Sequence, residues 1–487
     1  MENRQILNSI KTSETGVMIP YIVAVLALCI LIASYYGIID FSSTPLERRS
    51  PEIAILNKDG IKGLGATPIQ LRAVLKDSGA GLDEVVIRVT QGKKSYDLFR
   101  KDFDRKKEAS ISIPINPVEF GLLNGEATLE IKAFDASFWS NTAVEILSLP
   151  VDYELPSIQI LTSQHNAYQG GAQLIIYRAH DKNLLLSGVK TDEQIFAGFK
   201  ASLLDPAFSD PNLYAAIYSV PLTPRPTGYQ ITAFAEDFVG NEREVSFFNR
   251  VRKRRIQNRY VELYSDFLKG RLPAITSHAA SSISEQYSQK TLSDDPERLL
   301  SFVLNELDPL SKKAIRTIAQ QIKITKKQWE NPFYLNKGSV EIRYGEKVSF
   351  LHKDKIIGEM KSTGFFIRKQ YGEPVYASND GVVAFAGEIG TYGKTVLIDH
   401  GLGITTLYAH LSQVAVSKGD PVKARDRIGD TGLSGFAYEP GFWFEVLIQG
   451  VPSNPIEWWD KFWIKSHITN KTNRVKKLLG LAEISPL

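Results

Sequence analysis

The sequence has almost no cysteine: Cys29 is the only one in 487 residues. A single thiol cannot form a disulfide within the chain, and it cannot supply the several thiolates of a structural zinc site. Disulfide-stapled folds and zinc-finger classes are therefore excluded. The remaining composition is 43% hydrophobic and 23% charged, as in ordinary folded protein, and the length suits about three domains.

A strong excess of either charge is also lacking. The net charge of +4 is a weak bias for a chain of this length, and it gives no reason to expect a nucleic acid as a partner. The densest basic cluster is Arg252-Lys253-Arg254-Arg255. A patch for a membrane surface or a nucleic acid is one interpretation of this cluster, and a solvated link between domains is the simpler one.

One long segment has no charged side chain at all, residues 17–39. A helix of that length, at about 1.5 Å per residue, spans the hydrocarbon core of a bilayer. We expect a single transmembrane helix here, after a short cytoplasmic N-terminus at residues 1–16. A buried core helix, a cleaved signal peptide and a lipoprotein signal built on Cys29 are the alternatives. The run is too long for a signal peptide, and Leu28 stands where a lipoprotein signal needs a small residue.

Residues 50–250 alternate between apolar and polar side chains, which predicts strands. Ala133-Phe134-Asp135 precedes Asn141, and about a hundred residues later Ala235-Glu236-Asp237 precedes Gly240-Asn241. This corner ahead of a last strand resembles bacterial immunoglobulin-like domains. The resemblance implies two Ig-like β-sandwiches in tandem, at residues 50–152 and 153–250, acting as spacer or adhesive modules. One larger, irregular β domain is the alternative.

Helical patterns replace the alternation at residues 252–325. Asp294-Asp295-Pro296-Glu297 predicts a helix start, because an acidic cap and a proline in the first turn both favour it. Leu299, Leu300, Val303 and Leu304 then follow at helical spacing. We interpret the segment as a short helical linker.

The last part of the chain again predicts only short strands and glycine turns. It contains, in order, Gly372-Glu373-Pro374-Val375, Asp399-His400-Gly401, Leu407-Tyr408-Ala409-His410-Leu411-Ser412 and Asn454-Pro455. In this order and spacing, the motifs resemble the LytM (lysostaphin-like) family of peptidoglycan metalloendopeptidases. The resemblance implies a mainly β protein with a C-terminal LytM-type (duplicated hybrid motif) domain at residues 329–468, from a membrane-anchored subgroup with β domains ahead of the peptidase. Residues 469–487 are left as a basic tail.

The resemblance also shows what this chain has lost. In active members, the histidine and aspartate of a His-x-x-x-Asp motif and the second histidine of a His-x-His motif hold zinc. Those positions are Ser362, Phe366 and Trp443 here. Of two further histidines that orient water, one position is Gly441 and the other keeps its histidine, His410. No histidine lies in residues 353–399 or 411–466, so a small shift in alignment does not restore the set.

Phenylalanine has no donor atom, and the tryptophan N–H cannot bind a cation. We therefore expect no metal, no zinc cofactor and no catalytic residue. His410 would then remain only as a hydrogen-bonded histidine of the core or groove. A relocated metal site is a minor alternative, and it would draw on His352, His400, Glu439 or Glu445.

Aromatic residues are frequent near the former ligand positions. A candidate groove for sugar or peptide would be lined by Tyr408, Phe436, Tyr438, Phe442 and Trp443. The alternative is that these side chains fill the vacated zinc site and close the groove.

These observations favour a catalytically degenerate LytM-domain protein. It would regulate or scaffold cell-wall remodelling, for example by activating an amidase, or it would bind peptidoglycan; its partners would be peptidoglycan, a cell-wall hydrolase or another envelope protein. We expect it in the bacterial inner membrane, anchored by residues 17–39, with the bulk of the chain in the periplasm. An active zinc metalloendopeptidase that cleaves peptidoglycan crosslinks is the alternative.

Overall fold

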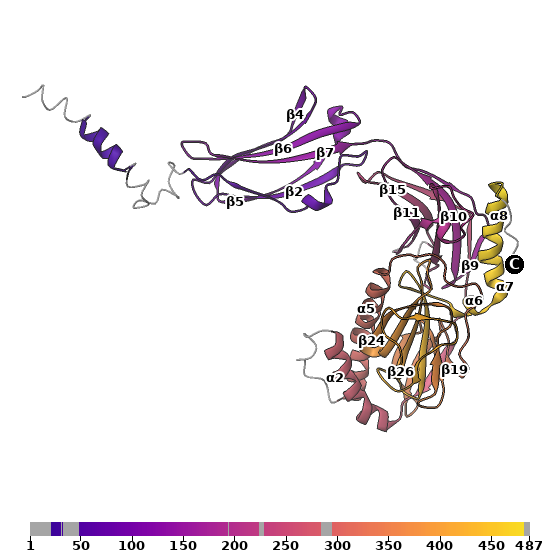
Figure 1. The fold of residues 1–487 in the computed structure, drawn as a ribbon. Helices are drawn as coiled ribbons and strands as arrows, with labels where there is room; N and C mark the ends of the chain where they lie inside the picture. Colours follow the sequence, from indigo (N-terminus) through magenta and orange to yellow (C-terminus); the bar gives the residue numbers. More distant parts are fainter. Residues whose placement is uncertain are drawn as a thin grey trace, which may run out of the picture. The chain divides into compact units, whose positions relative to one another are not determined.

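A computed structural model describes residues 21–30, 32, 48–192, 194–223, 228–283 and 295–481. The chain is mainly β (Figure 1). Its contacts divide it into two compact units, Met1–Leu155 with Phe238–Asn241, and Pro156–Asp237 with Glu242–Leu487. Of the apolar run, residues 21–30 and 32 are described, and they are helical. Within the described ranges, no helix is both long enough and apolar enough to cross a membrane.

The first unit is a sandwich of two sheets with the strand orders β1-β2-β5 and β4-β3-β6-β7. Alternate residues of its strands are buried in one shared apolar core, as the period of two predicts. The strands are β1 (Glu52–Ile55), β2 (Ile69–Lys76), β3 (Leu82–Gln91), β4 (Lys94–Lys106), β5 (Glu108–Ile115), β6 (Gly125–Asp135) and β7 (Thr142–Val151), with short 3-10 helices η1 (Lys58–Gly60) and η2 (Pro117–Phe120).

The second unit begins with another two-sheet arrangement, of strand orders β8-β10-β14-β13 and β12-β11-β15-β16. Apart from β13, this is the order of the first sandwich, strand for strand, so residues 50–250 form two β-sandwiches rather than one larger domain. The strands are β8 (Ser157–Ile160), β9 (His165–Tyr168), β10 (Ala172–His180), β11 (Leu184–Thr191), β12 (Gln194–Ala197), β13 (Phe199–Lys200), β14 (Leu213–Ser219), β15 (Ile231–Asp237), β16 (Glu242–Ser246) and β17 (Asn249–Arg252), with the 3-10 helix η3 (Ala201–Leu203).

The repeated corner has a physical basis in the first sandwich. Asp135 ends β6 and is buried. Its carboxylate accepts hydrogen bonds from the backbone N–H groups of Ser137 and Asn141 and from both of their side chains, at 2.7–3.2 Å. These bonds satisfy the buried charge and fix the loop before β7. In the second sandwich, Asp237 ends β15 in the same way and is also buried.

The C-terminal domain is built on one sheet of order β19-β22-β29-β26-β25-β24-β27, to which β23, β28 and β30 add. A second sheet has the order β18-β20-β21. The strands are β18 (Asn258–Glu262), β19 (Ser339–Ile342), β20 (Lys347–His352), β21 (Lys355–Lys361), β22 (Phe365–Arg368), β23 (Pro374–Tyr376), β24 (Gly381–Ile389), β25 (Gly393–Asp399), β26 (Ile404–Val414), β27 (Pro421–Val422), β28 (Arg427–Thr431), β29 (Gly441–Ile448) and β30 (Val451–Ser453), with the 3-10 helix η6 (Gly390–Tyr392).

The expected helices of residues 252–325 are present, but the segment is not a solvated linker. Strand β18 pairs in parallel with β20 of the C-terminal domain. The helices pack against the sheet, with α2 and α5 beside β24 (Figure 1). The sequence pattern showed that one helical face is apolar, but it did not show what that face covers. The helices are η4 (Phe267–Arg271), α2 (Leu272–Ile283), α4 (Pro296–Phe302), η5 (Val303–Leu307) and α5 (Asp308–Gln320).

The start of this helical cover follows the predicted cap. Asp295 is the N-cap of α4, and its side chain accepts a hydrogen bond from the Glu297 N–H at 3.0 Å. From Pro296 the segments α4, η5 and α5 run on to Gln320 without a break, and η5 is a π-helical turn. We call residues 296–320 the covering helix.

The basic tail contains a helix that packs on the rest of the second unit. Its first part forms α8, in which Lys471 and Lys476 are buried. Lys471 donates to the Gln173 side chain at 2.7 Å, so α8 packs on the second sandwich; residues 482–487 lie outside the described part. The C-terminal helices are α6 (Pro455–Trp459), α7 (Lys461–Ile464), η7 (Lys465–Thr469) and α8 (Asn470–Leu478).

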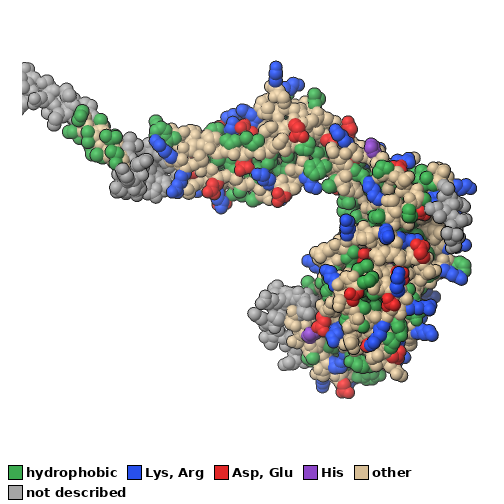
Figure 2. Space-filling model, in the orientation of Figure 1, with side chains coloured by type: hydrophobic (Ala, Val, Ile, Leu, Met, Phe, Trp, Pro, Cys, Tyr) green, Lys and Arg blue, Asp and Glu red, His purple; other side chains and the backbone are tan. Residues whose placement is uncertain are grey.

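Basic and acidic side chains are interspersed over the face drawn in Figure 2, as the small net charge suggests. Such a surface is not the basic stripe of a nucleic-acid binder.

Candidate functional site

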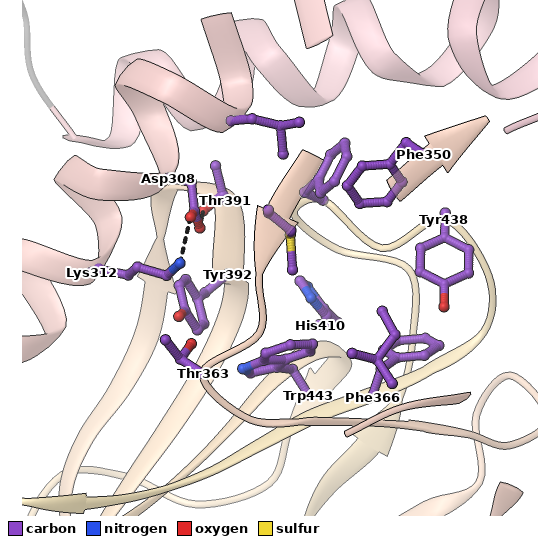
Figure 3. Close-up of a pocket in the computed structure, with 14 residues that line it drawn as sticks. Asp308, Lys312, Phe350, Thr363, Phe366, Thr391, Tyr392, His410, Tyr438 and Trp443 are labelled. Carbon is purple, nitrogen blue, oxygen red and sulfur yellow. Dashed lines mark hydrogen bonds and ion pairs between the residues drawn. The ribbon is translucent and has the colours of Figure 1, made fainter. Parts of the chain in front are cut away.

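Three neighbouring strands bring Phe366, Trp443 and His410 together. Phe366 of β22 lies opposite Trp443 of β29, and Trp443 lies opposite Ala409 of β26 on its other side. His410 follows Ala409, and its ring centre is 6.3 Å from that of Phe366 and 6.5 Å from that of Trp443. All three side chains line one cavity (Figure 3). Phe366, Trp443 and His410 therefore lie together in the fold.

His410 reaches this cavity through an unusual backbone conformation. Neighbouring residues of a strand point to opposite faces, yet His410 and its neighbour Ala409 pack on the same side. His410 has φ of +63°, which few residues other than glycine adopt, and the pairing of β26 with β28 shifts just beyond it. This bend turns the imidazole toward Phe366 and Trp443. Such a bend cannot be read from alternation.

The surroundings of His410 favour a neutral ring. Its Nδ1 donates to the Ser434 carbonyl at 2.9 Å, and the ring stacks on Tyr392. Burial lowers the pKa of His410 to about 4, despite the hydrogen bonds to carbonyl groups. At neutral pH the residue is therefore a hydrogen-bonded, uncharged histidine.

A buried glutamate lies beside the cavity and accepts hydrogen bonds from three of the residues that line it. Glu445 Oε1 accepts hydrogen bonds from Thr363 Oγ1 at 2.6 Å, Trp443 Nε1 at 2.7 Å and Tyr392 Oη at 3.0 Å. Burial raises the pKa of Glu445, although these donors act against the rise. Thr363 and Tyr392 had no signal in the sequence, because their roles depend on contacts between distant segments.

Ser362 and Gly441 do not line the cavity. Ser362 is fully buried, and its hydroxyl donates to the Gly364 carbonyl at 2.8 Å, so it closes a turn ahead of β22. A Cβ atom at Gly441 would lie 2.5 Å from the Ile367 carbonyl oxygen and 2.9 Å from Cζ of Phe366. The present packing leaves no room for a histidine at that position.

The candidate groove is divided between two faces of the sheet. Phe436, Tyr438 and Trp443 line the cavity (Figure 3). Tyr408 and Phe442 are fully buried and belong to the apolar cluster on the opposite face. They are the strand neighbours of Ala409 and Trp443, so the period of two places them on the other side. The expectation that all five residues line one groove was therefore wrong for Tyr408 and Phe442.

The covering helix closes the cavity from the other side. Leu304, Asp308 and Lys312 repeat at four-residue spacing and all line the cavity. Figure 3 shows Asp308 and Lys312 on the helix side of it. Ser311 Oγ accepts from the Thr391 N–H at 3.0 Å, and Asp308 pairs with Lys312 at 2.6 Å. The remaining cavity has a volume of about 40 Å³. That space suits two or three water molecules and no peptide or sugar.

The residues present at this site do not suit zinc. Phe366 has no donor atom, the Trp443 N–H is committed to Glu445, and the Ser362 hydroxyl is committed to a carbonyl. His352 and His400 point elsewhere: the first bonds to the Leu263 carbonyl, and the second to the Asp380 carbonyl and Thr406. Glu439 lies near Arg368, at 3.7 Å. In the described ranges, no three His, Cys, Asp or Glu residues form a group suited to a metal.

Comparison with known proteins gives matches to the same part of the chain. Residues 360–455 match the family model described as Peptidase family M23. The chain is 42% identical over 94 residues to the DD-carboxypeptidase/endopeptidase Mpg of Neisseria meningitidis, covering 19% of this chain and 22% of that protein. It is 33% identical over 126 residues to the murein hydrolase activator EnvC of Escherichia coli, covering 26% of this chain and 28% of that protein.

Among solved structures, a Pseudomonas aeruginosa protein described as peptidase M23 is similar at a TM-score of 0.31 and 16% identity, covering 60% of this chain and 94% of that one. The chain spans less than a third of the length of the two curated relatives.

Proposed function

Because the C-terminal part of this chain, residues 360–455, is a domain of peptidase family M23, we propose that it serves cell-wall remodelling without cleaving peptidoglycan itself. One observation carries this proposal. The positions that hold zinc in active LytM-type members are Ser362, Phe366 and Trp443, and their side chains are buried, committed to other contacts or free of donor atoms. A hydrolytic metal site needs three protein ligands and an open position for water.

The covering helix supports the same proposal from a second direction. A peptidase needs a groove that admits an extended peptide, and pockets for small ligands have volumes of about 300–1,000 Å³. The cavity at His410 has about 40 Å³, and Leu304 and Lys312 of the covering helix form part of its lining. Cleavage in this place would require both a new ligand set and removal of the helix.

The role that fits a non-catalytic M23 domain is control or scaffolding of a separate cell-wall hydrolase. EnvC, one of the similar proteins, is named as a murein hydrolase activator. Peptidoglycan, a hydrolase such as an amidase, or another envelope protein is the proposed partner. We place the protein in the bacterial inner membrane, held by residues 17–39, with the rest of the chain in the periplasm. The two β-sandwiches, which we regard as Ig-like, act as spacers.

The test uses the full chain purified in detergent. Zinc is offered and then measured by mass spectrometry after gel filtration, and the protein is incubated with purified sacculi. We expect far less than one zinc per chain and no released muropeptides. An M23 endopeptidase in parallel shows that the sacculi are cleavable. Stoichiometric zinc together with released muropeptides would overturn the non-catalytic proposal.

The regulatory part is tested separately. Amidases from the same bacterium are incubated with sacculi, with and without the full chain, and the released stem peptides are counted. We expect one of these hydrolases to work at least several-fold faster with the chain present. If none changes its rate and none co-purifies with the chain from membranes, regulation of a hydrolase is excluded.

A further inference from the structure

Two aromatic side chains stand in solvent at one end of the first sandwich. Phe138 is 74% exposed and Trp139 is 49% exposed, in the loop between β6 and β7. Their rings meet edge to face at 5.2 Å, so the pair forms one apolar projection. Exposed aromatic pairs commonly mark a surface that contacts something apolar.

This loop lies at the end of the sandwich where the chain enters it. Glu52, the first residue of β1, pairs with Lys76 at the end of β2, and Lys76 pairs with Glu108 at the start of β5. In the other sheet, Leu82 at the start of β3 pairs with Asp135 at the end of β6 and with Lys106. The loops β2–β3, β4–β5 and β6–β7 are therefore at the entry end. The guanidinium of Arg48 confirms the placement, because it lies 5.1 Å from the Trp139 ring centre.

The distance to the apolar run is short. That run ends at residue 39, and Arg48 is nine residues later. An extended chain covers at most about 3.6 Å per residue, so the separation is at most about 32 Å. A longer tether would leave the sandwich free to turn any side toward the membrane. This one holds the entry end within about 32 Å of the end of the apolar run.

The chemistry of the entry end suits a lipid surface. Tryptophan and phenylalanine beside cations match the headgroup layer, where one side of the residue is apolar and the other is wet. The cations at this end are Arg48 and Arg49 with the hairpin residues Arg105, Lys106 and Lys107, which are exposed. Each such cation near an anionic bilayer contributes about 1 kcal/mol. Asp104 and Glu108 also face this end, and Glu108 is paired with Lys76 at 3.4 Å.

We propose that the aromatic tip, Phe138 and Trp139 with Arg48 and Arg49 beside them, inserts into the lipid headgroup layer of the membrane that holds residues 17–39. The tip then fixes the tilt of the first sandwich on that membrane. This inference rests on the proposed membrane anchor, and its partner is the lipid surface itself.

The test places one spin label at each end of the first sandwich. In a Cys29→Ala background, Ser140→Cys labels the tip, and Lys93→Cys labels the exposed turn between β3 and β4 at the opposite end. The full chain is reconstituted into vesicles of phosphatidylethanolamine and phosphatidylglycerol. Collision rates with oxygen, which enters lipid, and with a water-soluble nickel chelate are then compared. We expect oxygen to dominate at position 140 and nickel at position 93.

The Phe138→Ser/Trp139→Ser variant sharpens the result. We expect it to float with the vesicles as the parent does, because residues 17–39 are intact, while the label at position 140 becomes accessible to nickel. If the parent protein floats with the vesicles but its label at position 140 collides mainly with nickel, the proposed insertion of the tip is contradicted and the membrane anchor is not. Failure of the parent to float would overturn both proposals together.

Discussion

On one face of the C-terminal sheet, Phe366, His410 and Trp443 lie under the covering helix. On the other face, Tyr408, Phe442 and Phe444 belong to the apolar cluster that also contains the core of the second sandwich. Each face also buries a glutamate. Glu445 on the site face has three side-chain donors, whereas Glu457 beside the sandwich accepts from the Ala172 N–H at 2.7 Å.

The difference shows two ways of covering a sheet. The face against the sandwich is a continuous apolar interface into which a few polar groups are built. The site face has a bent strand at His410, a small cavity and hydrogen-bond donors that converge on one carboxylate. Its lining is mainly aromatic and aliphatic. The two faces therefore differ in what covers them, a helix on one side and a β-sandwich on the other.

The largest effect is expected where the covering helix meets the sheet. Leu300 is fully buried, and its side chain packs against Gly358 of β21. Leu300→Ala should lower the free energy of unfolding by about 2–5 kcal/mol, because it leaves a cavity. Chemical denaturation of the full chain, followed by tryptophan fluorescence, measures this change. Leu185→Ala, at a half-exposed leucine of the second sandwich, is the control and should change little. Equal effects of the two would mean that the helix is not part of the core.

The next effect concerns the face toward the second sandwich and depends on pH. Burial raises the pKa of Glu457 from 4.5 to about 8. The folded state therefore favours the protonated acid, and the stability it contributes is complete below pH 4.5 and lost as pH rises to 8. Glu457→Gln should match the parent near pH 4.5 and be more stable at pH 8, by on the order of 3 kcal/mol. Thermal unfolding of the parent and of Glu457→Gln between pH 4.5 and pH 8.5 measures the stability of both proteins.

Lys471, on the same side, works in the opposite direction. Burial lowers its pKa from 10.5 to about 7, so its contribution is complete above pH 10.5 and lost as pH falls through 7. Comparing Glu457→Gln with the parent protein at pH 4.5–6.5 isolates the glutamate, because Lys471 and the buried histidines titrate alike in both proteins and their contributions cancel in the difference. An unchanged pH dependence in that window would show that Glu457 is not the group responsible.

A smaller effect is expected when the histidine of the family motif is put back. Gly441→His should cost about 1–3 kcal/mol, because its Cβ meets the Ile367 carbonyl and the Phe366 ring. The melting temperature should fall and should not recover when zinc is added. Gly270→His, at a glycine with open space around it, is the control. Recovery of the Gly441→His protein in zinc would contradict the view that this site has lost the metal.

The smallest effect is expected from one hydrogen bond between helix and sheet. Ser311→Ala leaves the buried Thr391 N–H without its 3.0 Å acceptor, which should cost about 1–2 kcal/mol. Hydrogen exchange at Thr391 should become faster. Ser301→Ala lies on the exposed side of the same helical run and should leave exchange at Thr391 as it is.

Much of the fold could be predicted from the sequence. Alternation predicted the sandwich strands, and Asp295 with Pro296 predicted the start of α4. The site could be predicted only in part. The family resemblance indicated that Phe366 and Trp443 belong to one site, but not that they are paired on neighbouring strands. The period of two could have separated Phe442 from Trp443. The position of the covering helix could not be predicted, because an apolar helical face does not show which surface it will pack against. The bend at His410 and the hydrogen bonds of Glu445 depend on distant segments meeting.

The tight packing at Gly441 bears on how such a protein can change over time. The family's metal site would need new side chains at four positions of this chain. A histidine at Gly441 alone would strain the fold before the other ligands were in place. Trp443 could not be replaced without removing a donor to the buried Glu445. At Gly441 and Trp443, a single substitution toward the family's ligand set therefore weakens the packing before a complete set of ligands is present.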